Sequence, residues 1–227
     1  MSGCECKPDW AQPSRMNNSD QILRNPSLAL APGEDGYLAY DIQSHCLHRL
    51  NPAAALIVEL SDGTRNEAKI CAELTSILGA AGLDACAQWI AAARAQGLLQ
   101  YVKANAAIPA APSATDLREA ARELRAEGHV LAAFVCQHHA VSLAPDDARQ
   151  WRSLGELAHI VGRREDARAA YERYLALHPQ DPEIEHILVS LRDEAPPPRA
   201  PNRCIEQLYS RFAEFYEENM CDDLEYR

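Results

Sequence analysis

The sequence predicts a mainly α-helical chain, with a small antiparallel β-sheet near the N-terminus and an array of helical hairpins after it. Short segments of alternating polarity, separated by turn residues, lie between residues 27 and 50 and predict the strands. Capped amphipathic segments follow, and from residue 128 identical residues recur 34 positions apart, which predicts repeated helical units. The hydrophobic content of 47% is rich in alanine, which favours helix packing over a β-sandwich.

Length and charge narrow the class of protein. The 227 residues suffice for two small domains or one large one. The net charge of −11 argues against nucleic acid as a partner, because phosphate binding needs clustered Lys and Arg. The sequence has no apolar run of roughly eighteen residues and no signal-peptide pattern, so we expect a cytoplasmic protein without a membrane partner. The eight cysteines show no framework spacing and are expected to be free thiols.

Residues 1–21 are expected to form a disordered polar tail. The tail holds a C-x-C pair, Cys4 and Cys6, which supplies only two of the four ligands that zinc prefers, so no metal site is predicted. From Pro26 onward the pattern changes to that of a small antiparallel sheet. Its three predicted strands are residues 27–30, 37–42 and 45–50.

Three helices are predicted after the strands. Asn51 is a good N-cap for the first helix, and Pro52 takes the first helical position, where its missing N–H costs nothing. Thr64 is predicted to cap the second helix and to form a capping box with Glu67. The second helix is placed at about 65–78, the third at about 84–96, and a last strand at 98–102.

A pattern that runs through these helices carries a family resemblance. Its members are Leu50-Asn51, Leu60, Asp62-Gly63-Thr64, Ile70, Leu74 and Gly97-Leu98-Leu99. The pattern resembles a PqqD-type domain, a small winged-helix fold, over residues 22–103. The resemblance implies a recognition element that binds the leader segment of a ribosomally made precursor peptide in natural-product biosynthesis.

The resemblance also implies where such a peptide would bind. The peptide would add as a strand to the edge of the third predicted strand, with its side chains over the third helix. Trp89 is the predicted anchor of this groove, and a core tryptophan packed on the sheet is the equal alternative. The predicted peptide-binding residues are His45, Cys46, Leu47, His48, Arg49, Ala85, Trp89, Ala92 and Gln96.

Two other functions of this region are less well supported. A winged helix often reads DNA, but the third helix carries Arg94 as its only cation, too little to neutralise phosphates. Cys46 and His48 would share one face of a strand while His45 points away, and two ligands fall short of a metal site. We therefore predict neither nucleic acid nor a metal here.

An internal repeat begins after a predicted linker at residues 104–113. Gly128 and Gly162 are 34 residues apart, and so are Pro145 and Pro179. This is the period of the tetratricopeptide repeat, a pair of antiparallel helices. The second copy resembles that family at Trp151, Leu154, Gly155, Gly162, Ala167, Tyr171 and Pro179.

The array is expected to contain about two and a half repeats, over residues 114–195. The first copy, residues 114–147, matches the pattern less well, and a half repeat at 182–192 would cover the open end. The histidines of these helices, His139 among them, are interpreted as ordinary residues of the helix surface.

The last predicted helix, residues 203–220, follows a proline-rich linker at 196–202. Its apolar stripe either folds back on the repeats or covers another surface. Residues 208–213, 215–216 and 224–227 resemble the lead-in helix of class I S-adenosylmethionine-dependent methyltransferases. No G-x-G-x-G loop follows a strand in the sequence, so no cofactor is expected in this chain, and S-adenosylmethionine is expected only if a methyltransferase domain follows residue 227.

Together these features predict the peptide-binding and scaffolding portion of a ribosomal peptide natural-product tailoring protein. It would recruit a precursor leader peptide to a missing or separate methyltransferase domain, or to another tailoring enzyme. The chain shows no G-x-S-x-G elbow or similar constellation, so it is expected to be the N-terminal part of such an enzyme and not catalytic by itself. The alternative is a complete, non-catalytic adaptor whose repeats and C-terminal helix dock a partner enzyme.

Overall fold

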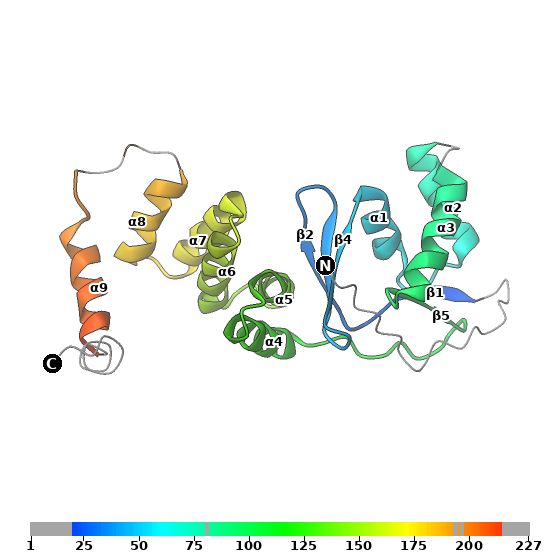
Figure 1. Ribbon diagram of the computed structural model, residues 1–227, viewed down its shortest axis with the longest axis horizontal. Coiled ribbons are helices and arrows are strands. Elements are labelled where there is room, and N and C mark those ends of the chain that lie inside the picture. Colours follow the sequence, from blue (N-terminus) through cyan, green and yellow to red (C-terminus); the bar gives the residue numbers. More distant parts are fainter. Residues whose placement is uncertain (1–19, 80–81, 193–194, 196–197, 215–227) are drawn as a thin grey trace. The chain divides into compact units, whose positions relative to one another are not determined.

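The computed structural model describes residues 20–79, 82–192, 195 and 198–214. The chain divides into two compact units, Met1–Ala140 and Val141–Arg227. The predicted fold class is confirmed, since helices predominate and the strands form small antiparallel sheets (Figure 1). No helix within the described ranges combines the length and apolar character that crossing a bilayer requires.

The first unit contains two small sheets. Strands β2 (Leu28–Pro32), β3 (Tyr37–Asp41) and β4 (Cys46–Leu50) form an antiparallel sheet in that order. Strand β1 (Gln21–Arg24) pairs with β5 (Leu99–Val102) in a second sheet, in which Ile22 lies opposite Tyr101. The last predicted strand is confirmed as β5. The tail prediction is wrong at its end, because Gln21 begins β1, whose partner is far away in the sequence.

Helix α1 (Pro52–Leu60) begins as predicted. The side chain of Asn51 accepts a hydrogen bond of 2.9 Å from the N–H of Ala54, and Pro52 is the first helical residue. The predicted capping box of the next helix is wrong, because α2 (Glu67–Leu78) is capped by Asn66, which accepts from the N–H of Lys69. Thr64 instead belongs to a turn, in which its N–H donates to Asp62 over 2.9 Å.

Helix α3 (Gly82–Ala95) is followed by Gly97, whose φ of 77° lies in the left-handed region that favours glycine. The predicted core face of α3 is confirmed, since Cys86, Ile90 and Ala93 are buried. Helices α1–α3 enclose one core with the inner side of the three-stranded sheet, to which Ala39 and Leu50 contribute. Both α3 and β4 contribute side chains to this core, which fixes the two elements relative to each other.

Two further helices, α4 (Ala114–Ala126) and α5 (Val130–Leu143), correspond to the first predicted repeat. Ser113 and Asp116 form a capping box at the start of α4. The tight turn between the two helices contains Gly128, with a φ of 83°.

The second unit consists of helices. Helices α6 (Ala148–Ile160) and α7 (Arg164–Leu177) form a hairpin that turns at Gly162, and α8 (Pro182–Leu191) packs on α7. Helix α9 (Asn202–Glu214) packs on α8. The predicted extension of this last helix to residue 220 lies outside the described residues.

Candidate functional site

Strand β4 lies at an end of the three-stranded sheet, and within the described residues no strand pairs with its outer edge. Its side chains alternate as a strand requires. Leu47 and Arg49 are exposed, while Cys46 and His48 are half-buried on the opposite face. Burial lowers the pKa of His48, although the charge of Asp41 acts in the opposite direction. The predicted strand residues 46–49 therefore offer a free edge with two distinct faces.

His45 does not belong to this strand, which corrects its predicted place. It lies in the turn before β4 with a φ of 55°, and its Nδ1 is 3.0 Å from the hydroxyl oxygen of Tyr40. The two rings also meet edge to face, with centroids 6.5 Å apart. The left-handed backbone conformation of His45 lets the turn reverse the chain, so that Cys46 can pair with Asp41.

The predicted residues of α3 differ in exposure. Trp89 is half-buried and packs against the core of the first unit, while Ala92 is exposed. Gln96 is also exposed and follows the last helical residue, with its N–H donating to the carbonyl of Ala92 over 3.0 Å. Ala85 lies within α3, but its side chain is outside what the structure describes. Part of the Trp89 side chain thus packs against the core, and the rest is accessible to solvent.

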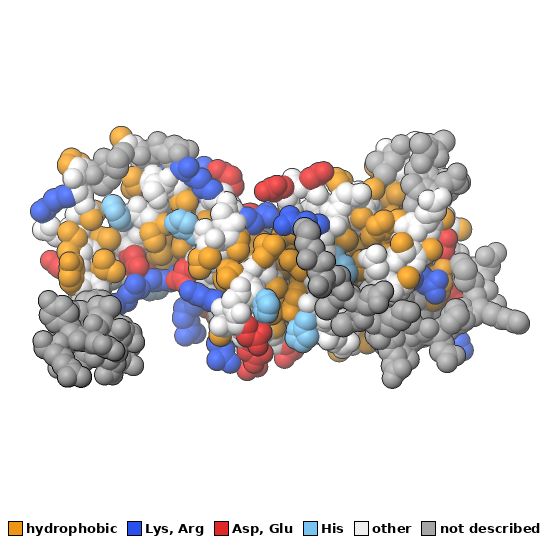
Figure 2. Space-filling view, viewed as in Figure 1, with side chains coloured by type: hydrophobic (Ala, Val, Ile, Leu, Met, Phe, Trp, Pro, Cys, Tyr) orange, Lys and Arg blue, Asp and Glu red, His pale blue; other side chains and the backbone are white. Residues whose placement is uncertain are grey.

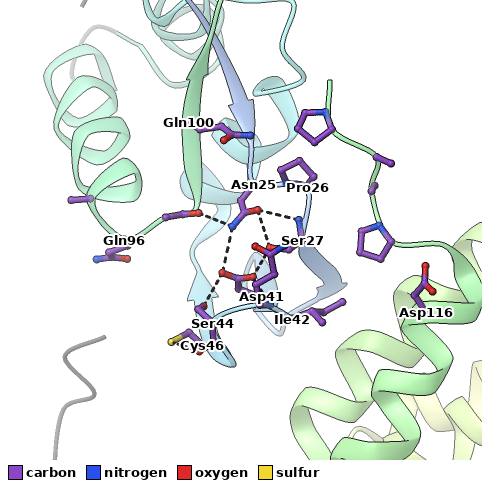
Figure 3. Close-up of a pocket in the computed structure, with 17 residues that line it drawn as sticks. Asn25, Pro26, Ser27, Asp41, Ile42, Ser44, Cys46, Gln96, Gln100 and Asp116 are labelled. Atoms are coloured by element: carbon purple, nitrogen blue, oxygen red, sulfur yellow. Dashed lines mark hydrogen bonds between the residues drawn. The ribbon is translucent and has the colours of Figure 1, made fainter. Parts of the chain in front are cut away.

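Two of the predicted residues, Cys46 and Gln96, line the same hollow, which has a volume of about 1090 Å³ (Figure 3). The sequence prediction missed most of its wall, which includes Asn25, Ser27 and Gln100. Trp89, Ala92 and Leu47 do not line it. Asn25 and Ser27 precede β2 while Gln100 lies in β5, so only the folded chain brings these missed residues together.

A hydrogen-bond network centred on Asp41 fixes one wall of this hollow (Figure 3). The buried carboxylate accepts hydrogen bonds from the hydroxyls of Ser27 and Ser44 and from the backbone N–H of Gln43. Asn25 donates to Asp41 over 3.4 Å and to the carbonyl of Gly97 over 3.0 Å, so it connects the sheet with the end of α3. Burial alone would raise the pKa of Asp41, but the hydrogen bonds from both serines hold it below the usual value.

A smaller hollow, of about 530 Å³, lies on the other face of β4. On the sheet side it is lined by Tyr40, His45 and Leu47. The α4–α5 turn supplies its opposite wall, and the residues there are Leu124, Glu127, Gly128, His129, Val130, Leu131 and Ala132. The free edge of β4 therefore has one hollow at its N-terminal end and another beside its exposed face.

The same sheet is covered on its opposite edge. The N–H of Leu30 in β2 donates to Nδ1 of His139 in α5 over 3.3 Å, and His139 is half-buried. The interpretation of His139 as an ordinary surface residue is therefore wrong. Burial lowers its pKa, with smaller contributions in the same direction from Arg24 and His138.

In the second unit, the predicted repeat residues Gly155 and Tyr171 fit against each other. A Cβ atom on Gly155 would lie 2.5 Å from a ring carbon of Tyr171, which is fully buried. Only glycine allows α6 and α7 to approach this closely around the ring. The predicted role of small and aromatic residues in this hairpin is confirmed.

A charged network joins α6, α8 and α9. Arg152 donates to Asp181 and to Glu183, each over 2.9 Å, and Asp181 also accepts from the hydroxyl of Tyr174. Gln207 and Arg211 of α9 donate to the same two carboxylates, over 3.1 and 3.0 Å. Polar contacts therefore hold α9 against its neighbours.

The apolar stripe of α9 faces away from these contacts. Ile205, Leu208 and Tyr209 have exposed fractions of 36%, 51% and 65%. Hydrophobic side chains are visible over this helix in Figure 2. The helix does pack on the repeat helix α8, but it does so through its polar side and the buried Cys204. The remainder of the predicted stripe, from Phe215 onward, lies outside the described residues.

Comparison with known proteins identifies part of the second unit. Residues 148–191 match the family model of the tetratricopeptide repeat. Protein O-mannosyl-transferase TMTC1 of Homo sapiens is 38% identical over 69 residues, which is 30% of this chain and 8% of the human protein. The protein of the same name from Mus musculus is also 38% identical over 69 residues, which is 7% of its length. The chain thus spans less than a tenth of these curated relatives, and the second unit contains a tetratricopeptide helical-hairpin region.

Proposed function

We propose that this chain is the peptide-binding and scaffolding portion of a tailoring protein for ribosomal peptide natural products. Residues 22–103 would form a PqqD-like recognition domain, and residues 114–195 the repeats that follow it. Tetratricopeptide repeats commonly present surfaces to other proteins, which agrees with a scaffold. The more specific role, binding of a precursor leader peptide, rests on the free edge of β4.

The edge of β4 is the observation that carries this proposal. An extended peptide that pairs with β4 would satisfy main-chain groups that have no partner strand within the described residues. Successive side chains of the peptide would point to opposite faces. Those on one face would lie on the side of Cys46 and His48, and those on the other would lie on the side of Leu47 and the smaller hollow.

A methyltransferase domain or another tailoring enzyme is the proposed recipient of the peptide. S-adenosylmethionine would then belong to that domain and not to the residues described for this chain. The alternative function is an adaptor without catalytic activity, whose repeats and last helix dock a partner enzyme. The exposed Ile205, Leu208 and Tyr209 favour this alternative, because they leave an apolar face available on α9.

The test is a titration of the full chain against a fluorescently labelled leader segment of the precursor peptide encoded beside its gene. Because Trp89 is the proposed anchor of the peptide, we expect Trp89→Ala to weaken binding at least about tenfold, the size of effect that a tryptophan anchor commonly has. Trp151→Ala is the matched control, because Trp151 is also half-buried but lies in α6. Equal affinities of the parent and Trp89→Ala would rule out the groove.

A second series distinguishes strand addition from other modes of binding. Leader peptides are N-methylated at one position at a time, which removes one main-chain donor per peptide. Pairing with β4 predicts that binding is lost at every second position, because alternate N–H groups face the strand. Loss confined to one or two adjacent positions would contradict strand addition, and absence of binding by the folded parent would favour the adaptor.

A further inference from the structure

Two buried cysteines face each other between α2 and α3. Cys71 and Cys86 have exposed fractions of 5% and 1%, and the Sγ of Cys71 lies 2.8 Å from the Sγ of Cys86. A disulfide bond measures about 2.0 Å, so the two sulfur atoms need to approach by less than an ångström to bond. Both belong to the core of the first unit.

The surroundings hold the two sulfurs in this arrangement. Helices α2 and α3 pack directly on each other, and Thr75 donates to the carbonyl of Cys71 over 2.7 Å, one turn along α2. Other cysteines differ. Cys136 is fully buried, and within the described residues it has no second sulfur in hydrogen-bond contact. Burial alone therefore does not distinguish Cys71 and Cys86, whereas their mutual contact does.

We propose that Cys71 and Cys86 form an oxidisable dithiol, which a peroxide converts to a disulfide that ties α2 to α3. The thiolate of one cysteine attacks a peroxide oxygen, the O–O bond breaks, and hydroxide leaves, which gives a sulfenic acid. The sulfur of the second cysteine then attacks the sulfenic sulfur and the S–O bond breaks. The thiol proton of the second cysteine passes to the departing oxygen, which leaves as water. Two thiols and one hydrogen peroxide give one disulfide and two waters, with two electrons passing from sulfur to the peroxide.

The environment keeps this dithiol reduced until an oxidant reaches it. Burial, and then the hydrogen bond with Cys71, raise the pKa of Cys86 to about 12. The reactive thiolate is consequently scarce, and oxidation should be slow unless α2 and α3 separate briefly. The dithiol is independent of whether a peptide binds β4.

The disulfide should stabilise the first unit. It would link positions that are 15 residues apart and so restrict the unfolded chain. We expect oxidation to raise the thermal midpoint of this unit by roughly 5–10 °C. Reduction with dithiothreitol should return the midpoint to its starting value.

The experiment uses the full chain with and without hydrogen peroxide, followed by alkylation under denaturing conditions, trypsin and mass spectrometry. Residues 70–94 contain both cysteines and no internal Lys or Arg, so they form one tryptic peptide. We expect this peptide to become two hydrogens lighter than the unmodified reduced peptide and to resist alkylation. The peptide with Cys136 is the internal control and should remain alkylated.

Variants test the assignment further. Cys71→Ala and Cys86→Ala should each abolish the rise of the thermal midpoint, while Cys136→Ala should retain it. Full alkylation of residues 70–94 after peroxide treatment of the parent would overturn the proposal. This readout does not depend on whether the alanine variants fold. An unchanged midpoint after disulfide formation would equally contradict a tie between α2 and α3.

Discussion

The two units of the chain use their polar groups differently. In the second unit, Arg152 donates to Asp181 and Glu183, and α9 donates to the same two carboxylates, so the network holds the helices together. In the first unit, the network around Asp41 lines an open hollow, and no described strand pairs with the outer edge of the nearby strand β4. This difference teaches that the network of the second unit satisfies its charges by joining helices, while the β4 edge of the first unit has no partner strand among the described residues. The predictions below test that contrast.

The largest expected effect is in the closed network of the second unit. Arg152→Met would leave the buried carboxylate of Asp181 without its cation, and we expect the free energy of unfolding to fall by about 3 kcal/mol. Urea denaturation followed by circular dichroism measures this loss. Arg149→Met is the control on the same helix, because the Arg149 side chain is 90% exposed and its removal should have almost no effect. Similar losses of stability from both variants would show that the ion pairs of Arg152 do not contribute specifically to the stability of this unit.

Gly155→Ala tests the packing of the same unit. The added methyl group would collide with the ring of Tyr171, and we expect a loss of about 2 kcal/mol in the free energy of unfolding. The same change in a Tyr171→Ala background should cost much less, because the colliding ring is gone. A double-mutant cycle by urea denaturation measures the difference. Additive effects would mean that α6 and α7 do not meet at this contact.

How much of each unit is predictable from sequence follows from the range of its contacts. The repeat around Gly155 and Tyr171 is recognisable because the same helix contacts recur with a fixed period. The start of α1 is recognisable because Asn51 caps it within three residues. Strand β1 was missed because it is defined by pairing with β5, which lies far away in the sequence.

The candidate site was predicted in part for the same reason. The strand at residues 46–49 follows from the local sequence pattern, its role as a peptide-binding edge from the resemblance to PqqD-type domains, and Gln96 from the helix face that it shares with Trp89 and Ala92. Asn25 and Ser27 carry no sign of their role until the fold brings them to Asp41. Similarly, Thr64 is a residue type that often caps helices, and Glu67 was its predicted capping-box partner. In the structure the N–H of Thr64 donates instead to the carboxylate of Asp62.

A smaller effect is expected from the open network of the first unit. Asp41→Asn replaces a carboxylate that accepts several hydrogen bonds, and we expect a loss of about 1.5 kcal/mol at pH 7. Because folding lowers the pKa of Asp41, its contribution is present above the usual value of about 3.9 and is lost as the pH falls through the lowered value. Urea denaturation between pH 3 and pH 7 should show a flatter profile for the variant. Asp35→Asn, at an exposed turn, is the control and should keep the parental profile.

The smallest expected effect concerns the two edges of the three-stranded sheet. His139 covers the β2 edge by accepting the N–H of Leu30, which requires an unprotonated Nδ1. Its lowered pKa means that the neutral form is favoured in the folded chain. The stabilisation is therefore present above the usual histidine value of about 6.5 and is lost as the pH falls, by less than about 1 kcal/mol.

Hydrogen exchange of the Leu30 amide measures this effect directly. We expect its protection, corrected for intrinsic exchange, to fall between pH 7.5 and pH 5 in the parent. His139→Asn keeps an acceptor near the Nδ1 position without titrating, so protection should remain constant, whereas His139→Leu should lose it at both pH values. Constant protection in the parent would mean that α5 does not cover β2 through this bond. A pH-dependent loss would confirm that His139 covers the β2 edge, whereas the β4 edge has no partner strand among the described residues.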